Sequence, residues 1–243
     1  PDVIHLHIYY GQITSSIFSV IKKYNVPVVQ TLHEYKIVCP AYTMYRNDKQ
    51  CYSCKNNRFF NALRYNCKGS WAKSLLSMTE SYISLLLGSQ KHVDKFITVS
   101  SYQRNELIKM GLSKRKTQVL HNSISFDDFK FDLNFERKGL LYFGRLEYVK
   151  GIHVALQALK ILKDQYGIEV PFTIIGSGSE LDNLTALKEE LGISNVNFIP
   201  KVKRSELSLH LNKAIATIIP STWGETFGLT AIESMVHQTP VIA

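Results

Sequence analysis

Two glutamates near the end of the chain have the spacing of a ligand-binding pair. Glu225 lies in a loop of mainly small and polar residues after the apolar run 214–219, and Glu233 follows after seven intervening residues. The pattern predicts a helix that starts near 226–228 with Thr226 as N-cap, because a threonine hydroxyl can accept from an amide of the first turn. The positive end of that helix would be an anion site. The amides expected there belong to Thr226, Phe227, Gly228 and Leu229.

A second candidate group is cationic. The run G-R-L-E-Y-V-K-G at 144–151 follows a predicted strand, so Arg145 and Lys150 would lie beside the amides of the next helix. Two such cations could neutralise a departing diphosphate. Alone, the run also fits a solvated basic loop. The I-I-G-S-G-S turn at 174–179 fits either a nucleotide or tight packing, and it lacks the third glycine of a dinucleotide fingerprint.

The composite P-S-x-W-x-E-x-F-G-x-x-x-x-E at 220–233, with G-R-x-x-x-x-K-G upstream, resembles the family-4 retaining glycosyltransferases. The resemblance implies that Glu225 contacts the donor hexose and Glu233 the ribose. Arg145, Lys150 and the loop amides would grip the diphosphate. His33, in T-L-H-E, would lie next to the reacting sugar, as a catalytic residue together with Glu225. Further expected contacts are with the base, from Lys201 and Val202, and with the acceptor, from His7.

All four cysteines fall within residues 39–67. Their spacing is C-x11-C-x2-C-x12-C, formed by Cys39, Cys51, Cys54 and Cys67. Four thiolates could hold a closed, structural zinc ion without an open position for chemistry. No second C-x2-C is present, so reduced thiols, adventitious disulfides and an iron–sulfur cluster are the alternatives.

The elements that must position these residues alternate between strand and helix. Predicted strands and helices in the first half are strand 2–10, helix 14–24, strand 27–32, helix 71–87, strand 95–100, helix 101–110 and strand 116–120. The second half is predicted as strand 140–143, helix 151–166, strand 171–175, helix 181–191, strand 195–199, helix 206–212, strand 214–219, the helix of Glu233 and a strand from 240. Leu229, Ile232 and Val236 should face the sheet.

Such alternation indicates an α/β protein with two Rossmann-like, doubly wound parallel sheets, as in the GT-B glycosyltransferases that the motifs resemble. The predicted boundaries are an acceptor-side domain at 1–123 with a cysteine-containing insertion at 36–70, a linker at 124–137 and a donor domain at 138–243. Both ends begin or stop in a strand, so we expect a fragment truncated at both termini, whose activity without the missing parts is open.

Charge is unevenly distributed. Residues 1–125 carry 17 Lys and Arg against 6 Asp and Glu, a net +11, whereas residues 126–243 carry 12 against 14, a net −2. A basic half suggests an anionic partner, such as a membrane surface, a phosphorylated acceptor or nucleic acid. The amphipathic helix 71–87, with Lys68 and Lys73 near its start and Trp71 and Tyr82 along it, could rest on a bilayer or pack on the sheet. No apolar run is long enough to span a membrane, which favours a cytoplasmic protein with peripheral contact at the inner membrane face.

The expected reaction is therefore transfer of a hexose from a nucleotide sugar, with UDP favoured, to a hydroxyl acceptor that could be lipid-linked, in polysaccharide or glycolipid synthesis. By resemblance, configuration is retained and no cofactor or catalytic metal is needed. The alternatives are a basic, zinc-stapled nucleic-acid-binding protein and another GT-B sugar enzyme, such as a phosphorylase or an epimerase. Sugar, base, acceptor and oligomeric state do not follow from the sequence.

Overall fold

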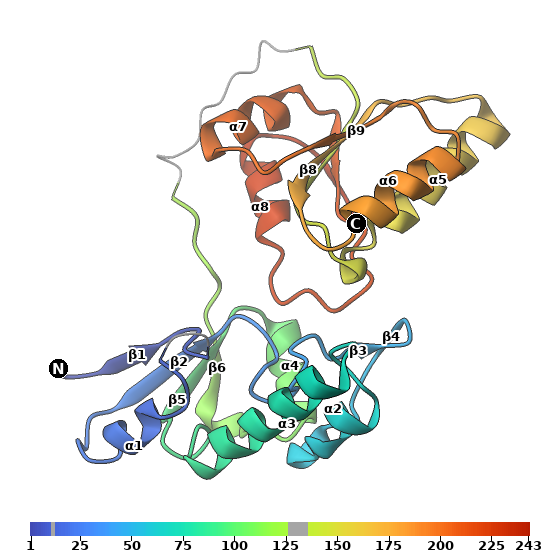
Figure 1. The fold of residues 1–243 in the computed structure, drawn as a ribbon. Coiled ribbons are helices and arrows are strands. Elements are labelled where there is room, and N and C mark those ends of the chain that lie inside the picture. Colours follow the sequence, from blue (N-terminus) through green and yellow to red (C-terminus); the bar gives the residue numbers. More distant parts are fainter. Residues whose placement is uncertain (11–12, 126–135) are drawn as a thin grey trace. The chain divides into compact units, whose positions relative to one another are not determined.

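The chain forms two compact units (Figure 1). A computed structural model describes residues 1–10, 13–125 and 136–243. The first unit contains Pro1–Asn122 together with Trp223–Phe227, and the second contains Ser123–Thr222 and Gly228–Ala243. The predicted linker at 124–137 falls mostly on residues 126–135, outside the described residues.

The first unit is built on a four-stranded sheet whose neighbouring strands are all parallel, in the order β1-β2-β5-β6. Its strands are β1 (Ile4–Leu6), β2 (Val28–Leu32), β5 (Lys95–Thr98) and β6 (Thr117–Val119). A short antiparallel hairpin joins β3 (Tyr45–Arg46) to β4 (Lys49–Gln50). The helices are α1 (Ile17–Ile21), η1 (Lys55–Asn57), α2 (Phe60–Arg64), α3 (Trp71–Leu86), α4 (Ser101–Lys109) and η2 (Lys114–Lys116).

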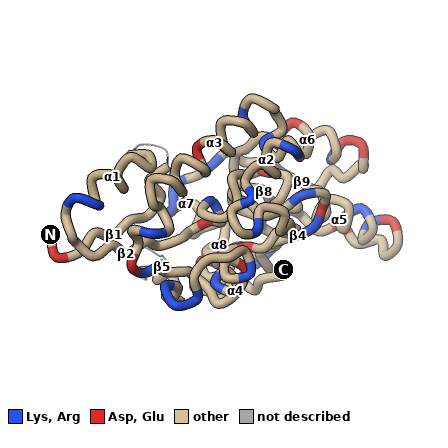
Figure 2. Tube along the Cα trace, turned by 90° about the horizontal axis from the view of Figure 1, so that it is seen from below, with Lys and Arg blue, Asp and Glu red and all other residues tan. Residues whose placement is uncertain are grey.

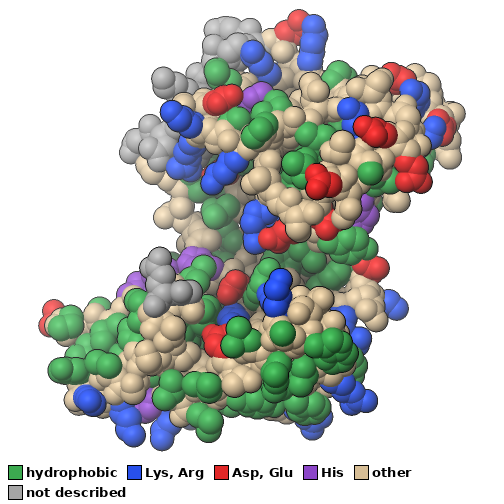
Figure 3. All heavy atoms as spheres, viewed as in Figure 1, with side chains coloured by type: hydrophobic (Ala, Val, Ile, Leu, Met, Phe, Trp, Pro, Cys, Tyr) green, Lys and Arg blue, Asp and Glu red, His purple; other side chains and the backbone are tan. Residues whose placement is uncertain are grey.

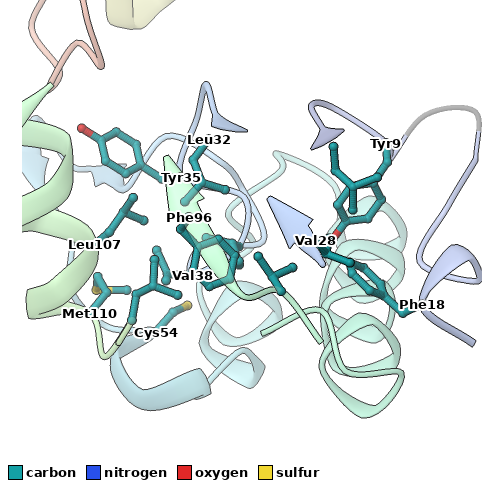
Figure 4. Close-up of a cluster of buried hydrophobic side chains, with 14 of the residues drawn as sticks. Tyr9, Phe18, Val28, Leu32, Tyr35, Val38, Cys54, Phe96, Leu107 and Met110 are labelled. Atoms are coloured by element: carbon teal, nitrogen blue, oxygen red, sulfur yellow. The ribbon is translucent and has the colours of Figure 1, made fainter. Parts of the chain in front are cut away.

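The β-branched run of β2 is buried because this strand is central in the sheet. Its flanking core is aromatic as well as aliphatic, and Figure 4 shows Phe96, Leu107, Val38 and Tyr35 converging there.

Two predicted elements of the first unit are shorter than expected. The strand predicted at 2–10 pairs only over Ile4–Leu6, where β2 offers partners. The helix predicted at 14–24 spans only Ile17–Ile21. Thr14 has a φ of 62°, a left-handed conformation that cannot belong to a right-handed helix.

The second unit has a five-stranded parallel sheet in the order β11-β10-β7-β8-β9. The strands are β7 (Leu140–Arg145), β8 (Phe172–Ser177), β9 (Val196–Ile199), β10 (Ala216–Ile218) and β11 (Val241–Ile242). The helices are η3 (Tyr148–Lys150), α5 (Ile152–Tyr166), α6 (Leu181–Glu190), α7 (Arg204–Lys213) and α8 (Leu229–Val236).

Alternate residues of β7 and β8 enter different cores, so this sheet is covered on both faces. Tyr142 and Ile174 pack with residues of α5 and α6. Leu141 and Ile175 pack instead with Leu211 of α7. This is the doubly wound α/β arrangement that the sequence predicts. None of the helices in the described ranges is long and apolar enough to cross a bilayer.

Candidate functional site

A cavity of about 290 Å³ opens at the carboxyl edge of the second sheet. It lies where β7, β8 and β9 end, the edge at which parallel α/β sheets bind ligands. Three of the residues predicted from sequence line it, namely Arg145, Lys201 and Val202. The remaining lining residues are Phe143, Gly144, Ile175, Gly176, Ser177 and Leu207. The cavity therefore combines two cations with an apolar wall, a composition suited to an anionic, ring-containing ligand.

Two glycines keep the backbone of this edge close together. A Cβ on Gly176 would lie 1.9 Å from the carbonyl oxygen of Gly144 on the adjacent strand, so no side chain fits there. Gly151 has a φ of 68°, and a Cβ on it would lie 1.8 Å from the carbonyl oxygen of Pro220. Glycine at 151 thus allows the turn before α5 to approach the loop that leads from β10.

Arg145 and Lys150 lie on opposite ends of the short connection between β7 and α5. Arg145 Nη1 contacts Glu147 Oε1 at 2.8 Å, and the arginine side chain is 59% exposed. Lys150 ends η3, and its neighbour Val149 accepts a 3.0 Å hydrogen bond from the amide of Thr222. This bond holds the loop that begins at Pro220 against the turn that carries the lysine.

Glu233 is half-buried on α8, whereas a simple solvated helix residue would be exposed. Its Oε1 lies 3.4 Å from Nη2 of Arg204, at the start of α7. Burial raises the pKa of the Glu233 carboxyl, and the positive charges of Arg204 and His237 oppose that rise. Arg204 was not singled out by the sequence motifs, because it lies on a different helix from the glutamate.

Helix α8 starts later than the sequence suggests. It begins at Leu229, after Gly228 in a left-handed conformation with φ 83°. Thr226 does not cap it: the N-cap is Gly228 without a side-chain hydrogen bond, and the Thr226 hydroxyl donates to the carbonyl of His33. The prediction that Leu229 faces the sheet is also wrong, since Leu229 is 44% exposed. Ser234 occupies the buried face and donates to the hydroxyl of Thr217 on β10 at 2.9 Å.

The segment Trp223–Phe227, which carries Glu225, is held by side chains of the first unit. Tyr35 donates from its hydroxyl to the carbonyl of Gly224 at 3.1 Å. Ser100, the N-cap of α4, donates to the carbonyl of Thr226 at 2.6 Å. Burial raises the pKa of the fully buried Tyr35, and Glu225 is one of the neighbouring negative charges that add to the rise. The phenol therefore stays protonated and serves as a donor.

Three histidines gather at the carboxyl ends of β1 and β2. His7 Nδ1 and His33 Nε2 are 2.9 Å apart, and the ring of His5 lies 4.4 Å from that of His7. Burial lowers the pKa of His33, and the neighbouring His7 and His5 lower it further. His33 is thus neutral at pH 7 and can accept or donate a hydrogen bond. The sequence pointed to His33 and His7, whereas His5 becomes part of the cluster only through the pairing of the two strands.

The four cysteines surround one cavity of about 20 Å³ in the first unit. Burial raises the pKa of Cys39 to about 11 and that of Cys54 to about 12, so these two are thiols. Within the described ranges, however, no group of three or more His, Cys, Asp or Glu side chains has an arrangement that could hold a metal ion. The zinc expectation for Cys39, Cys51, Cys54 and Cys67 therefore finds no support in the described residues.

Other proteins share this fold. Sucrose-phosphate synthase from Thermosynechococcus elongatus superposes with a TM-score of 0.68 at 18% identity, over 100% of this chain and 55% of that one. Anabaena Alr3699/HepE, solved in complex with UDP and glucose, gives 0.66 at 18% identity, over 100% and 59%. The two parallel sheets thus define a GT-B type fold with Rossmann-like units.

Sequence comparison identifies the family. Residues 1–128 match the model of Glycosyltransferase Family 4, and residues 123–243 match that of Glycosyl transferases group 1. The chain belongs to glycosyltransferase family 4.

Among the curated relatives, one matches the whole chain and another matches about two thirds of it. Glycogen synthase of Mycobacterium tuberculosis is 26% identical over 247 residues, which include 100% of this chain and 51% of that protein. D-inositol 3-phosphate glycosyltransferase of Mycolicibacterium smegmatis is 30% identical over 175 residues, covering 65% and 39%. The chain spans about half the length, or less, of these relatives.

Proposed function

We propose that the protein transfers a hexose from a nucleotide sugar, most favourably a UDP-sugar, to a hydroxyl acceptor in polysaccharide or glycolipid synthesis, with retention of configuration. The observation that carries the proposal is the cavity at the ends of β7, β8 and β9, with Arg145 and Lys201 on its wall. Support for the donor class comes from the Anabaena complex with UDP and glucose. Support for a hydroxyl acceptor comes from the names of the two mycobacterial relatives.

In this proposal each candidate residue has one role. As the bond between the sugar and the diphosphate breaks, negative charge grows on the leaving oxygen, and Arg145 and Lys150 stabilise it without a catalytic metal. Glu233 accepts hydrogen bonds from the ribose hydroxyls. Lys201 and Val202 border the base.

The reacting sugar is assigned to Glu225 and His33. Glu225 orients the hexose hydroxyls, and neutral His33 hydrogen-bonds near the anomeric centre. The amides of Thr226, Phe227, Gly228 and Leu229 complete the diphosphate contacts. The acceptor hydroxyl attacks from the face that the diphosphate leaves, which gives retention.

Calorimetry on the full-length protein tests the donor site, with UDP and inorganic pyrophosphate as separate ligands. Arg145→Ala should weaken the binding of both by about 10- to 100-fold, because it removes a charge-assisted contact to the diphosphate. Glu233→Gln should weaken UDP binding alone, because pyrophosphate has no ribose. Arg115→Ala in η2 and Glu190→Gln in α6 are the matched controls and should leave both affinities unchanged.

Unchanged UDP affinity in Arg145→Ala would remove the diphosphate role, and equal losses for both ligands in Glu233→Gln would remove the ribose role. Nuclear magnetic resonance of the anomeric proton in the product decides between retention and inversion.

A further inference from the structure

Helix α3 in the first unit has serines at its fully buried positions and large hydrophobic residues on its exposed side, while Met78, Tyr82 and Leu85 pack, partly buried, against the core. The four residues buried along it are all serines, namely Ser74, Ser77, Ser81 and Ser84. The hydroxyls of these serines form hydrogen bonds within the first unit. Ser77 donates to the carbonyl of Pro40 at 2.7 Å, and Ser74 donates to Oδ1 of Asn66 at 3.0 Å. Turning the helix to bury its apolar side would break these bonds, so its orientation is fixed.

The outward side carries large hydrophobic residues at helical spacing. These are Trp71, Leu75, Leu76, Ile83 and Leu86, and the last of them is 85% exposed. Ala72 and Thr79 are the other exposed residues on this side of the helix. The side carries no charged residue. Figure 3 shows hydrophobic side chains gathered over the region where Figure 1 draws α2 and α3. We call Trp71, Leu75, Leu76, Ile83 and Leu86 the α3 apolar face.

Aromatic side chains contribute to this face differently from the sequence-based expectation. Trp71 is outward, but Tyr82 is only partly exposed, and its hydroxyl accepts a hydrogen bond from the amide of Phe60 on α2. Tyr82 therefore braces α2 against α3.

Basic residues are in excess in the part of the chain around α3. Between residues 51 and 90 the positive side chains are Lys55, Arg58, Arg64, Lys68 and Lys73. The only negative one is Glu80, which pairs with Lys36. Figure 2 traces these basic and acidic positions along the chain. An apolar helix side with a surplus of lysine and arginine around it complements an anionic lipid surface.

We propose that the α3 apolar face docks the protein on an anionic lipid bilayer, with the helix lying in the plane of the interface. The hydrophobic side chains enter the boundary between headgroups and acyl chains, while Arg64 and Lys73 contact lipid phosphates. A partner protein with an acidic groove, or a second copy of the chain, fits less well. The face is flanked by positive charges that two copies would bring together. The proposal does not depend on the donor site.

Vesicle co-sedimentation of the full-length protein tests the proposal without donor or acceptor. The wild type should bind vesicles of phosphatidylcholine mixed with phosphatidylglycerol, and bind pure phosphatidylcholine much more weakly. Leu75→Ser/Leu86→Ser should lower binding to the anionic vesicles by about tenfold or more, because binding scales with the apolar area buried. Arg64→Glu/Lys73→Glu should lower it on anionic vesicles only.

The matched control is Ile161→Ser/Leu209→Ser, which changes two exposed aliphatic residues on α5 and α7 and should leave binding unchanged. Circular dichroism verifies that all variants are folded. The proposal is overturned if the wild type does not bind the anionic vesicles, or if the α3 variant binds them as well as the wild type does. A dimer that separates in the α3 variant, seen by analytical ultracentrifugation, would assign the face to a second copy instead.

Discussion

Helices α3 and α5, the two longest in the described part of the chain, differ in the kind of side chain at their fully buried positions. Helix α5 fully buries Ile152, Ala155, Leu156 and Leu159. The fully buried residues of α3 are all serines, and its core-packed hydrophobic residues are only partly buried. Both sequences have an apolar stripe at helical spacing. The difference shows that such a stripe locates one side of a helix but does not say whether that side meets the protein interior or another apolar medium.

The contrast extends to the rest of the first unit, where several buried groups next to the sheet are polar. Gln103 is fully buried, donates to the carbonyl of Leu32 and accepts from the amide of Val99. These two bonds pair a backbone carbonyl of β2 and the amide of Val99 with one buried side chain. The first unit thus combines its aromatic and aliphatic core with buried, hydrogen-bonded polar side chains along α3 and α4.

The largest effect should come from the aliphatic side of the comparison. Leu156→Ala in α5 removes a side chain that is 0% exposed and should lower the free energy of unfolding by about 2–5 kcal/mol. Leu76→Ala in α3, at 72% exposure, should change it by less than about 0.5 kcal/mol. Hydrogen exchange resolved by residue measures both. Comparable losses from the two variants would mean that the α3 apolar face is packed inside the protein.

A smaller effect is expected from the inner side of α3. Ser77→Ala removes the hydroxyl that donates to Pro40 and contacts Lys36 Nζ at 3.2 Å, which should cost about 1–2 kcal/mol. Thr79→Ala, on the outward side of the same helix, is the control and should be near neutral. A stabilised Ser77→Ala variant would show that the serines are packing residues and not hydrogen-bonding ones.

The smallest effect is a pH dependence confined to the first unit. Because burial and the neighbouring His7 and His5 lower the pKa of His33 below its ordinary value of 6.5, the unfolded chain binds a proton more readily than the folded one does. Stability should therefore rise with pH between the lowered value and 6.5 and should be level above it, as far as this group is concerned. Thermal unfolding of the wild type and His33→Gln across this range gives the slope, which should be shallower in the variant. Parallel slopes would show that His33 does not carry this dependence.

Much of the fold could be predicted from the sequence, because strands and helices alternate with clear periodicity. The helix predicted at 151–166 is found at Ile152–Tyr166, and that predicted at 71–87 at Trp71–Leu86. The start of α8 could not be predicted. Thr226 has the chemistry of a cap, but its hydroxyl bonds to His33, a residue distant in sequence. A prediction from local sequence cannot take account of a hydrogen-bond partner that is so far away along the chain.

In the candidate site, too, some residues could be predicted from the sequence and others could not. Arg145 ends β7, and Lys201 and Val202 come shortly after β9, so parallel topology alone brings them to one edge. Arg204 and His5 were missed, because each reaches its partner through the packing of a different element. Their roles depend on where α7 and β1 lie, which the local sequence does not encode.

The clustering of the cysteines has a practical consequence. The chain has four cysteines, all between residues 39 and 67, and the second unit has none. Cys51 differs from the others. Its half-burial opposes ionisation, but hydrogen bonds from Ser53 and the nearby Arg46 outweigh it and lower the thiol's pKa. A maleimide fluorophore used at limiting concentration should therefore react first with Cys51. The label would report on the first unit, and no cysteine of the second unit would have to be removed beforehand.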